Sequence, residues 1–266
     1  MNIAVFDLET NGLQGSSVLS ASSIVFDDEG VVLDVFNRFY LPLEPHNSYV
    51  TRIHGLTPGR LLALREHIEA PSHFIEDWPD LLNFWAALDV EGVVVHNLSF
   101  DTSFLPEIAQ SAFLWWCSMK GLTAYCAIPK RFGGVNGPFK WPKLEEAVDV
   151  VCDGPNALAP SKATGEAENQ VKNGVLHVSL FDCFGLYRVV SRIAKHRGDL
   201  LRFAPFITPF RPPKTRDGQA STRQAGPNGK TAPSRDRFIE DALAYECKLR
   251  SLIARSGSPD RVPLSG

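Results

Sequence analysis

Three runs of apolar and β-branched residues occupy most of the first forty positions, and they constrain the fold more than any other feature. Residues 2–6 form a short apolar run, which is typical of a central strand covered on both faces. Residues 18–26 and 31–40 are separated by Asp27-Asp28-Glu29-Gly30, whose composition predicts a hairpin turn. The chain is therefore predicted to open with a three-stranded meander.

Helical patterns and one further strand follow the meander. We expect a loop over residues 42–55, and Thr57 and Pro58 then predict the N-cap and first position of a helix that continues to about residue 68. Ser72 is the predicted cap of the next helix. Further predictions are a strand over 92–96, helices over 99–110, 122–128, 143–151 and 179–194, and a surface loop over 153–174. This order predicts an α/β fold, a mixed sheet flanked by helices on both faces, with its active site at the carboxyl ends of central strands.

The composition excludes several classes of protein. Apolar residues make up 44% and charged residues 21% of the chain, which is typical of a soluble globular protein. The sequence contains no apolar run of 18 residues, and its first segment meets Asp7 before any long apolar stretch, so we expect neither a membrane partner nor a secretory signal. The five cysteines are widely spaced without a CxxC pair, which indicates reduced thiols in a cytoplasmic protein: Cys117, Cys126, Cys152, Cys183 and Cys247.

The charge is distributed unevenly along the chain. Residues 1–110 contain 16 Asp and Glu against 4 Lys and Arg, whereas residues 195–237 contain 3 against 10. Such asymmetry suits an enzyme that gathers cations in one region and polyanions in another, although solvated surface charge explains it equally well. We predict a domain over residues 1–196, a flexible basic linker over 205–236 and an amphipathic helix over 237–255, which docks on the domain or on a protein partner.

A first cluster of functional residues follows the first predicted strand. Asp7 and Glu9 are two positions apart, so an extended backbone directs both carboxylates to one face. Two like charges at the end of a buried strand are costly unless cations neutralise them, and hard oxygen ligands suit Mg²⁺ or Mn²⁺. A lone DxE is weak evidence, because strand ends often carry acids.

Two further clusters lie later in the chain. Asp101 is predicted in the first turns of the helix that follows the strand over 92–96, a position where acids are also favoured as helix caps. His177 and Asp182 are five residues apart, so on one continuous helix their side chains would diverge; if His177 precedes the helix, both can face one cleft. A histidine beside a metal-held water is a suitable general base, although a surface histidine is the commoner case.

Together these clusters resemble the motifs of the DEDDh 3′-5′ exonucleases. FDLETNGL is similar to the first exonuclease motif of that family, HNLSFDTSFL to the second and HVSLFDC to the third, and IHGLT resembles a secondary signature between the first two. The resemblance covers about residues 2–194. Ser179 and Cys183 stand where the family commonly has alanine, and the loop before His177 is longer than expected.

The resemblance implies a ribonuclease H-like fold and a two-metal mechanism with two Mg²⁺ or Mn²⁺ ions. Asp7, Glu9 and Asp182 would hold one ion, Asp101 would support the second, and His177 would accept the proton of the attacking water. The substrate would be the 3′ end of single-stranded DNA or RNA, with DNA favoured, and the product a nucleoside 5′-monophosphate. An RNA-trimming exoribonuclease or oligoribonuclease, and an inactive nucleic-acid-binding module, remain alternatives. A glycosidase would leave His177 and two of the acids without a task.

Residues that contact the substrate are less specified. Leu8, His54 and Phe100 are candidates for wedging or stacking at the terminal nucleotide or else pack in the core, Leu13 is expected to pack, and Thr10 and Asn97 complete the predicted substrate site. Residues 118–143 contain five lysines and arginines, four aromatic residues and no acid. That combination is typical of single-strand binding, although core aromatics and solvated lysines account for it equally well.

Overall fold

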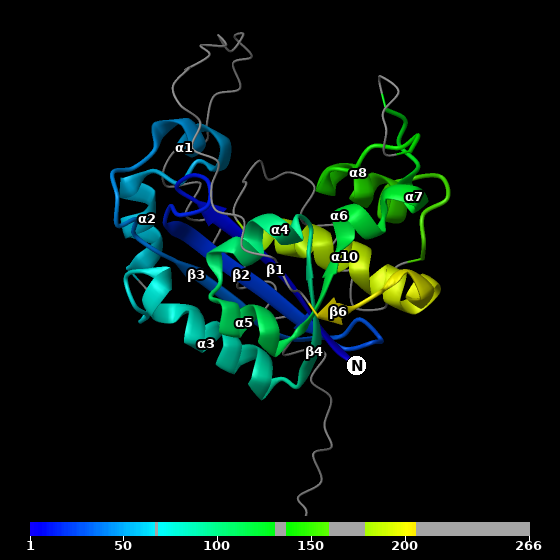
Figure 1. Ribbon diagram of the computed structural model, residues 1–266, viewed down its shortest axis with the longest axis horizontal. Helices are drawn as coiled ribbons and strands as arrows, with labels where there is room; N and C mark the ends of the chain where they lie inside the picture. The colour runs from blue at the N-terminus through cyan, green and yellow to red at the C-terminus, as the bar shows by residue number, and fades with distance from the viewer. Residues whose placement is uncertain (67–68, 131–136, 160–178, 206–266) are drawn as a thin grey trace, which may run out of the picture.

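The computed structural model describes residues 1–66, 69–130, 137–159 and 179–205 (Figure 1). His177 therefore lies outside the described residues, as do the predicted terminal helix over 237–255 and the basic linker from residue 206 onward. Among the helices that are described, none is long and apolar enough to cross a membrane.

A six-stranded mixed sheet in the order β3-β2-β1-β4-β5-β6 forms the centre of the molecule. β1 pairs antiparallel with β2 and parallel with β4, β2 pairs antiparallel with β3, β4 pairs parallel with β5, and β5 pairs antiparallel with β6. The strands are β1 (Asn2–Thr10), β2 (Val18–Phe26), β3 (Val32–Phe39), β4 (Val90–Val95), β5 (Leu114–Cys117) and β6 (Ala204–Pro205). The predicted meander and the ribonuclease H-like mixed sheet are confirmed, whereas β5 and β6 were not predicted.

β1 is longer than residues 2–6, and this positions the first acidic pair. Its antiparallel pairing with β2 continues to Thr10, with a register shift between Glu9 and Thr10. Asp7 and Glu9 are therefore strand residues rather than residues that follow a strand. They face one side of the sheet, while Phe6 and Leu8 pack in the core on the other side.

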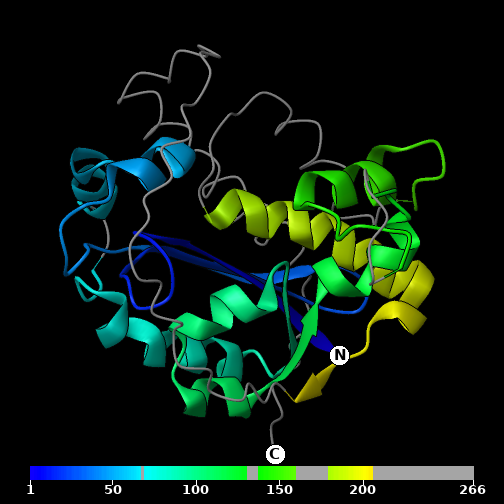
Figure 2. The ribbon, with the colours of Figure 1, turned by 45° about the horizontal axis from the view of Figure 1, so that its top comes forward.

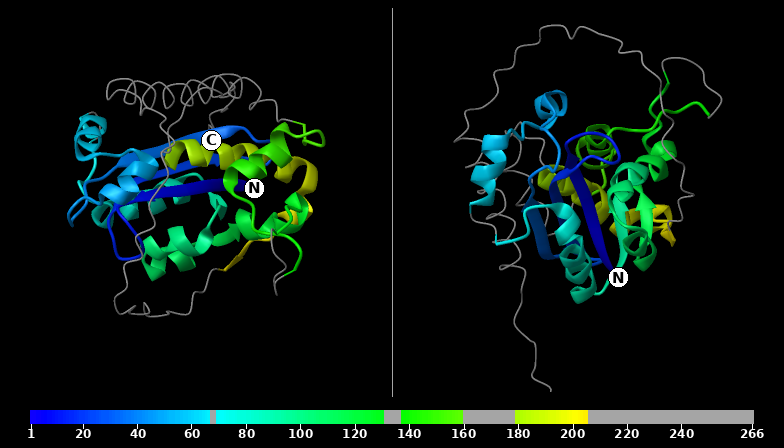
Figure 3. Two further views of the ribbon diagram at one scale, coloured as in Figure 1. Left: turned by 90° about the horizontal axis from the view of Figure 1, so that it is seen from above. Right: turned by 60° about the vertical axis from the view of Figure 1, so that its left-hand side comes forward.

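Helices cover both faces of the sheet, as expected. α3 (Phe74–Ala87) and α5 (Glu107–Ala112) lie on one face, and α10 (Ser179–Arg197) and α8 (Leu144–Val148) lie on the other (Figure 2). Seen from above, the yellow α10 crosses the blue strands of the sheet (Figure 3). The remaining helices and helical turns are α1 (Ser48–His54), α2 (Pro58–Arg65), α4 (Leu98–Asp101), η1 (Thr102–Phe104), α6 (Ser118–Gly121), α7 (Thr123–Cys126), η2 (Asp149–Asp153) and η3 (Gly198–Leu200).

Three predictions of local structure are wrong. The predicted loop over 42–55 contains α1, which begins after Asn47, whose Oδ1 accepts a hydrogen bond from the Tyr49 N–H at 3.0 Å. His73, not Ser72, is the N-cap of α3. The predicted helix over 99–110 is broken into α4, η1 and α5, because Pro106 cannot continue a helix through Leu105, whose backbone is extended.

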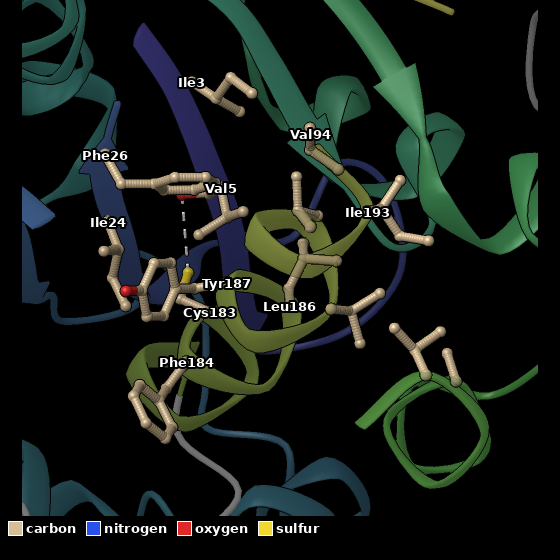
Figure 4. Packing of buried hydrophobic residues seen from close by; sticks show 14 of the residues in the cluster. Ile3, Val5, Ile24, Phe26, Val94, Cys183, Phe184, Leu186, Tyr187 and Ile193 are labelled. Carbon is tan, nitrogen blue, oxygen red and sulfur yellow. Dashed lines mark hydrogen bonds between the residues drawn. The ribbon is translucent and has the colours of Figure 1, made fainter. Parts of the chain in front are cut away.

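The core under α10 fixes the start of this helix on the sheet. Cys183, Leu186 and Tyr187 are buried against the apolar side chains of β1 and β2 (Figure 4). The Cys183 thiol donates to the carbonyl of Ser22 at 3.0 Å, and the Tyr187 hydroxyl donates to the carbonyl of Gly30 at 2.6 Å. Each fully buried apolar side chain contributes about 1.5–3 kcal/mol, so the first turn of α10 is held firmly over β1.

Candidate metal centre

Three carboxylates converge over β1. One carboxylate oxygen from each of Asp7, Glu9 and Asp182 lies within 4.8 Å of the other two. Asp7 and Glu9 come from one face of β1, and Asp182 comes from the first turn of α10, which the core packing holds over that strand. The structure thus brings together three of the four acids that the sequence motifs singled out.

Asp101 is buried beside this group and is held by the backbone of β1. Its Oδ1 accepts a hydrogen bond from the Leu8 N–H at 3.2 Å, and the side chain is only 3% exposed. β1 and β4 are parallel, so the residues that follow β4 reach the edge of the sheet where β1 ends. Asp101 therefore adjoins the other acids without being part of their 4.8 Å group.

Burial and mutual repulsion favour the protonated forms of these acids. Desolvation, followed by the charges of Asp101 and Asp182, raises the pKa of Asp7 well above its ordinary value. Desolvation and then Asp182 raise the pKa of Glu9 in the same way. Burial raises the pKa of Asp101 to about 8, although the hydrogen bond from Leu8 opposes the shift. Divalent cations relieve both penalties, and carboxylate oxygens are the ligands that Mg²⁺ and Mn²⁺ prefer, so the donor set fits such ions.

A group of buried serine hydroxyls underlies the acids, and the motifs did not reveal it. Ser22 and Ser20 stand opposite Asp7 and Glu9 in the β1–β2 register, and both are fully buried. The Ser179 hydroxyl contacts both of them, at 2.7 Å from Ser22 Oγ. Because Asp182 follows Ser179 by about one helical turn, this contact ties its helix to β2. The signal in the sequence was a strand with three serines among apolar residues, two of them, Ser20 and Ser22, at alternate positions.

The predicted substrate residues occupy different environments. Leu8 is buried on the face of β1 opposite Asp7, and Thr10 is buried with its hydroxyl donating to the carbonyl of Gly12 at 2.7 Å. Asn97 is exposed at the start of α4. Phe100 is half-buried, with its ring 5.2 Å from that of Phe104 and inclined to it at 63°.

His54 and Leu13 flank the end of β1. His54 is buried at the end of α1, where its Nδ1 accepts a hydrogen bond from the Leu56 N–H at 3.0 Å. Burial lowers the pKa of His54 to about 4, with a further contribution from His46, so the ring is neutral at pH 7. Leu13 was expected to pack but is 81% exposed, because it lies in the turn that follows β1.

A separate cavity of about 590 Å³ lies on the α3 side of the sheet. The turn after β1, the beginning of α3 and residues 103–106 line it, with Phe74, Trp78 and Phe104 among the lining side chains. None of the four acids lines this cavity. Desolvation raises the pKa of its Glu44 carboxyl group, but hydrogen bonds from Ser17 and then from Asn11 outweigh this and lower the pKa to about 2.

The described part of the chain is an α/β, ribonuclease H-like domain with an acidic centre at the carboxyl edge of its sheet. No family model matches the sequence, and no curated protein matches it. Among the solved structures that match are several exonucleases. Exonuclease X in complex with 5′-overhanging duplex DNA is 20% identical, covers 74% of this chain and 93% of its own, and has a TM-score of 0.44.

Two other matches are larger than the described domain. A 3′-exonuclease bound to a histone mRNA stem-loop is 11% identical with a TM-score of 0.47, and the match covers 76% of this chain and 66% of that one. E. coli Exonuclease I with an oligonucleotide is 15% identical with a TM-score of 0.45, with coverage of 75% and 42%. This chain thus spans less than two thirds of either protein, and the likeness concerns the fold.

Proposed function

We propose that the chain is a metal-dependent 3′-5′ exonuclease that acts on single-stranded nucleic acid, with DNA favoured. One observation carries the proposal: the Asp7, Glu9 and Asp182 carboxylates converge within 4.8 Å, beside a buried Asp101. These are the four acids that the three exonuclease-like motifs contribute. Their convergence from distant parts of the sequence supports a shared task.

The acids would hold Mg²⁺ or Mn²⁺. Asp7, Glu9 and Asp182 would supply oxygen ligands for one ion, and Asp101 would support a second. Divalent ions in such centres polarise the phosphate and lower the pKa of water. The proposed product is a nucleoside 5′-monophosphate.

Residues of the chain would perform the remaining tasks. His177 lies outside the described residues, two positions before Ser179, the first described residue of α10. We assign the general base to it, because an imidazole with a pKa near neutrality accepts a proton efficiently. The exposed Leu13 is a candidate for a wedge at the terminal base, since it projects from the turn after β1.

A direct assay tests this proposal. Full-length protein with Mg²⁺ is given matched DNA and RNA strands labelled at the 5′ or the 3′ end. Stepwise shortening of the 5′-labelled strands, with immediate release of a labelled monophosphate from the 3′-labelled strands, is expected. Asp182→Asn should abolish it, whereas Asp28→Asn, at an exposed acid, should not. Metal-dependent binding of oligonucleotides without any cleavage would instead support the inactive binding module.

A further inference from the structure

Trp141 is exposed, unlike the other tryptophans of the chain. It is 58% exposed, whereas Trp85, Trp115 and Trp116 are 0%, 2% and 4% exposed, and Trp78 is half-buried. An exposed indole gains little from the fold, and a large flat ring beside a nucleic-acid site is suited to base stacking. Exposure alone does not identify a binding site, so the neighbours of Trp141 and its position in the fold must be considered.

A lysine lies over the Trp141 ring. Lys120 Nζ is 5.8 Å from the ring centroid, within the range of a cation–π contact. The other described lysines of this region are engaged differently: Lys130 donates to the carbonyl of Gly137 at 2.9 Å, Lys140 pairs with Glu146, and Lys143 pairs with Glu145 at 3.0 Å. Acids of the next helix therefore neutralise two lysines of residues 118–143, and Lys120 is not one of them.

The other described aromatic residues of this region are less available than Trp141. Tyr125 is half-buried against the core under α10, with the Arg197 guanidinium 5.6 Å from its ring centroid. Phe139 is half-buried in a backbone bridge with Pro129. Trp141 thus offers an accessible ring together with a cation.

Hydrogen bonds of His96 connect the segments that carry Trp141 and Lys120 to the end of β4. Its Nε2 donates to the carbonyl of Pro142 at 3.1 Å, and its Nδ1 lies 2.9 Å from the hydroxyl of Ser118. Burial lowers the pKa of His96 to about 4, so one neutral tautomer makes both bonds at pH 7. Pro142 follows Trp141, and Ser118 begins the helix that carries Lys120.

The strand register places His96 next to the acids. β4 runs parallel to β1, and the last pair of their register is Val5 with Val94, so His96, directly after β4, lies at the edge of the sheet toward which β1 carries Asp7. Adjacent strands are about 4.8 Å apart. The Trp141–Lys120 pair is therefore attached one strand away from the metal centre, at the same edge of the sheet.

We propose that Trp141 and Lys120 form a platform for the substrate strand upstream of the scissile bond. A base of the unpaired strand stacks on the indole, and Lys120 contacts an adjacent phosphate. This inference rests on the proposed function, since it assigns the path of the same substrate. Single-stranded nucleic acid is the occupant because it supplies both the planar base and the negative charge that the pair is built to contact.

Binding of a labelled oligothymidylate of about ten nucleotides, followed by fluorescence anisotropy in Ca²⁺, tests the platform. Trp141→Ala is expected to weaken binding about 5- to 100-fold, the range for loss of one base–aromatic stack, while Trp141→Phe retains most of the affinity. Lys120→Ala should reduce the salt dependence of log K by about 0.7, the value for one phosphate contact on a single strand. Ile108→Ala, at an exposed apolar residue of α5, is the control.

Substrate length separates this inference from the proposed function. If the chain is an exonuclease, Trp141→Ala should impair cleavage of the long oligonucleotide and leave cleavage of a dinucleotide unchanged. Wild-type protein that cleaves neither substrate refutes the proposed function alone, because the anisotropy assay still tests the platform. Equal oligonucleotide affinity of wild type and Trp141→Ala, or an effect confined to duplexes, would overturn the platform.

Discussion

The surroundings of Asp7 disfavour its charged form. Most substitutions of buried residues destabilise a protein, whereas replacing Asp7 by a neutral residue should stabilise the metal-free protein. In metal-free protein, Asp7→Asn is expected to raise the melting temperature by at least about 2 °C, because the amide avoids the desolvation of a buried carboxylate and the repulsion from Asp101 and Asp182. With Mg²⁺ the order should reverse, since the wild type gains ion binding and the variant loses it. Thermal unfolding in EDTA and in Mg²⁺ measures both effects.

The control for this comparison is Asp28→Asn. Asp28 is an exposed acid 3.8 Å from the N-terminal ammonium group, outside the acidic centre. Its substitution should leave the response to Mg²⁺ intact. A metal-free Asp7→Asn protein that melts below the wild type would show that the acids do not repel one another in the fold.

His96 should make the free energy of unfolding depend on pH. Its pKa is about 4 in the folded protein and about 6.5 in an unfolded chain, so the unfolded state binds more protons between these values. The free energy of unfolding should therefore fall as the pH decreases through this window. Urea unfolding between pH ~7 and ~4.5 should give a shallower slope for His96→Asn. His54 should preserve part of the slope, because its pKa is also about 4.

Some residues of the acidic centre could be predicted from the sequence, and others could not. Asp7, Glu9, Asp101 and Asp182 were found because short polar motifs interrupt apolar runs. Ser20 and Ser22 were not, since their role depends on pairing with β1 and on a helix whose Ser179 follows Ser22 by 157 residues. Such contacts are properties of the fold rather than of any local pattern.

At the scale of elements, the contact between α10 and β2 is a specific cross-link. Ser179→Ala is expected to lower the free energy of unfolding by about 1–2 kcal/mol, because the buried hydroxyls of Ser20 and Ser22 lose their partner. It should also weaken Mn²⁺ binding, since Asp182 depends on the same helix turn.

A double-mutant cycle distinguishes this cross-link from general packing. Adding Ser20→Ala to Ser179→Ala should cost less than the sum of the single changes, because both remove the same contact. Urea unfolding of the four proteins gives the coupling energy. Additive changes would mean that the two hydroxyls act independently.

The elements that were predicted and missed differ in length and context. β1, β2 and β3 were recognised because each is long and β-rich, and α10 because apolar residues recur at helical spacing from Leu180 to Ile193. β5 is a four-residue strand and β6 a two-residue strand, so neither has enough residues to show a periodicity. α1 was missed because its capping residue Asn47 lies in a segment rich in turn-forming residues.

At the scale of the whole molecule, the segment after α10 adds the edge strand β6 to the sheet and packs the ring of Phe203 against Gly92 of β4. A Cβ at Gly92 would lie 2.5 Å from the Phe203 ring, so Gly92→Ala is expected to displace that ring and lower the free energy of unfolding by about 1–3 kcal/mol. Gly59→Ala is the matched control, since its Cβ meets no atom within 4 Å. Gly59→Ala should be neutral or stabilise by up to about 1 kcal/mol. Urea unfolding compares the two, and equal stabilities would contradict the close packing.

Successive side chains of β1 point to opposite faces of the sheet: Asp7 and Glu9 face α10, and Phe6 and Leu8 face α3. Inserting or deleting one residue early in this strand would turn the carboxylates into the hydrocarbon core and bring Phe6 and Leu8 out beneath Asp182. Variants that change side chains along β1 can therefore still fold, whereas variants that change its length should lose the acidic centre and the core together.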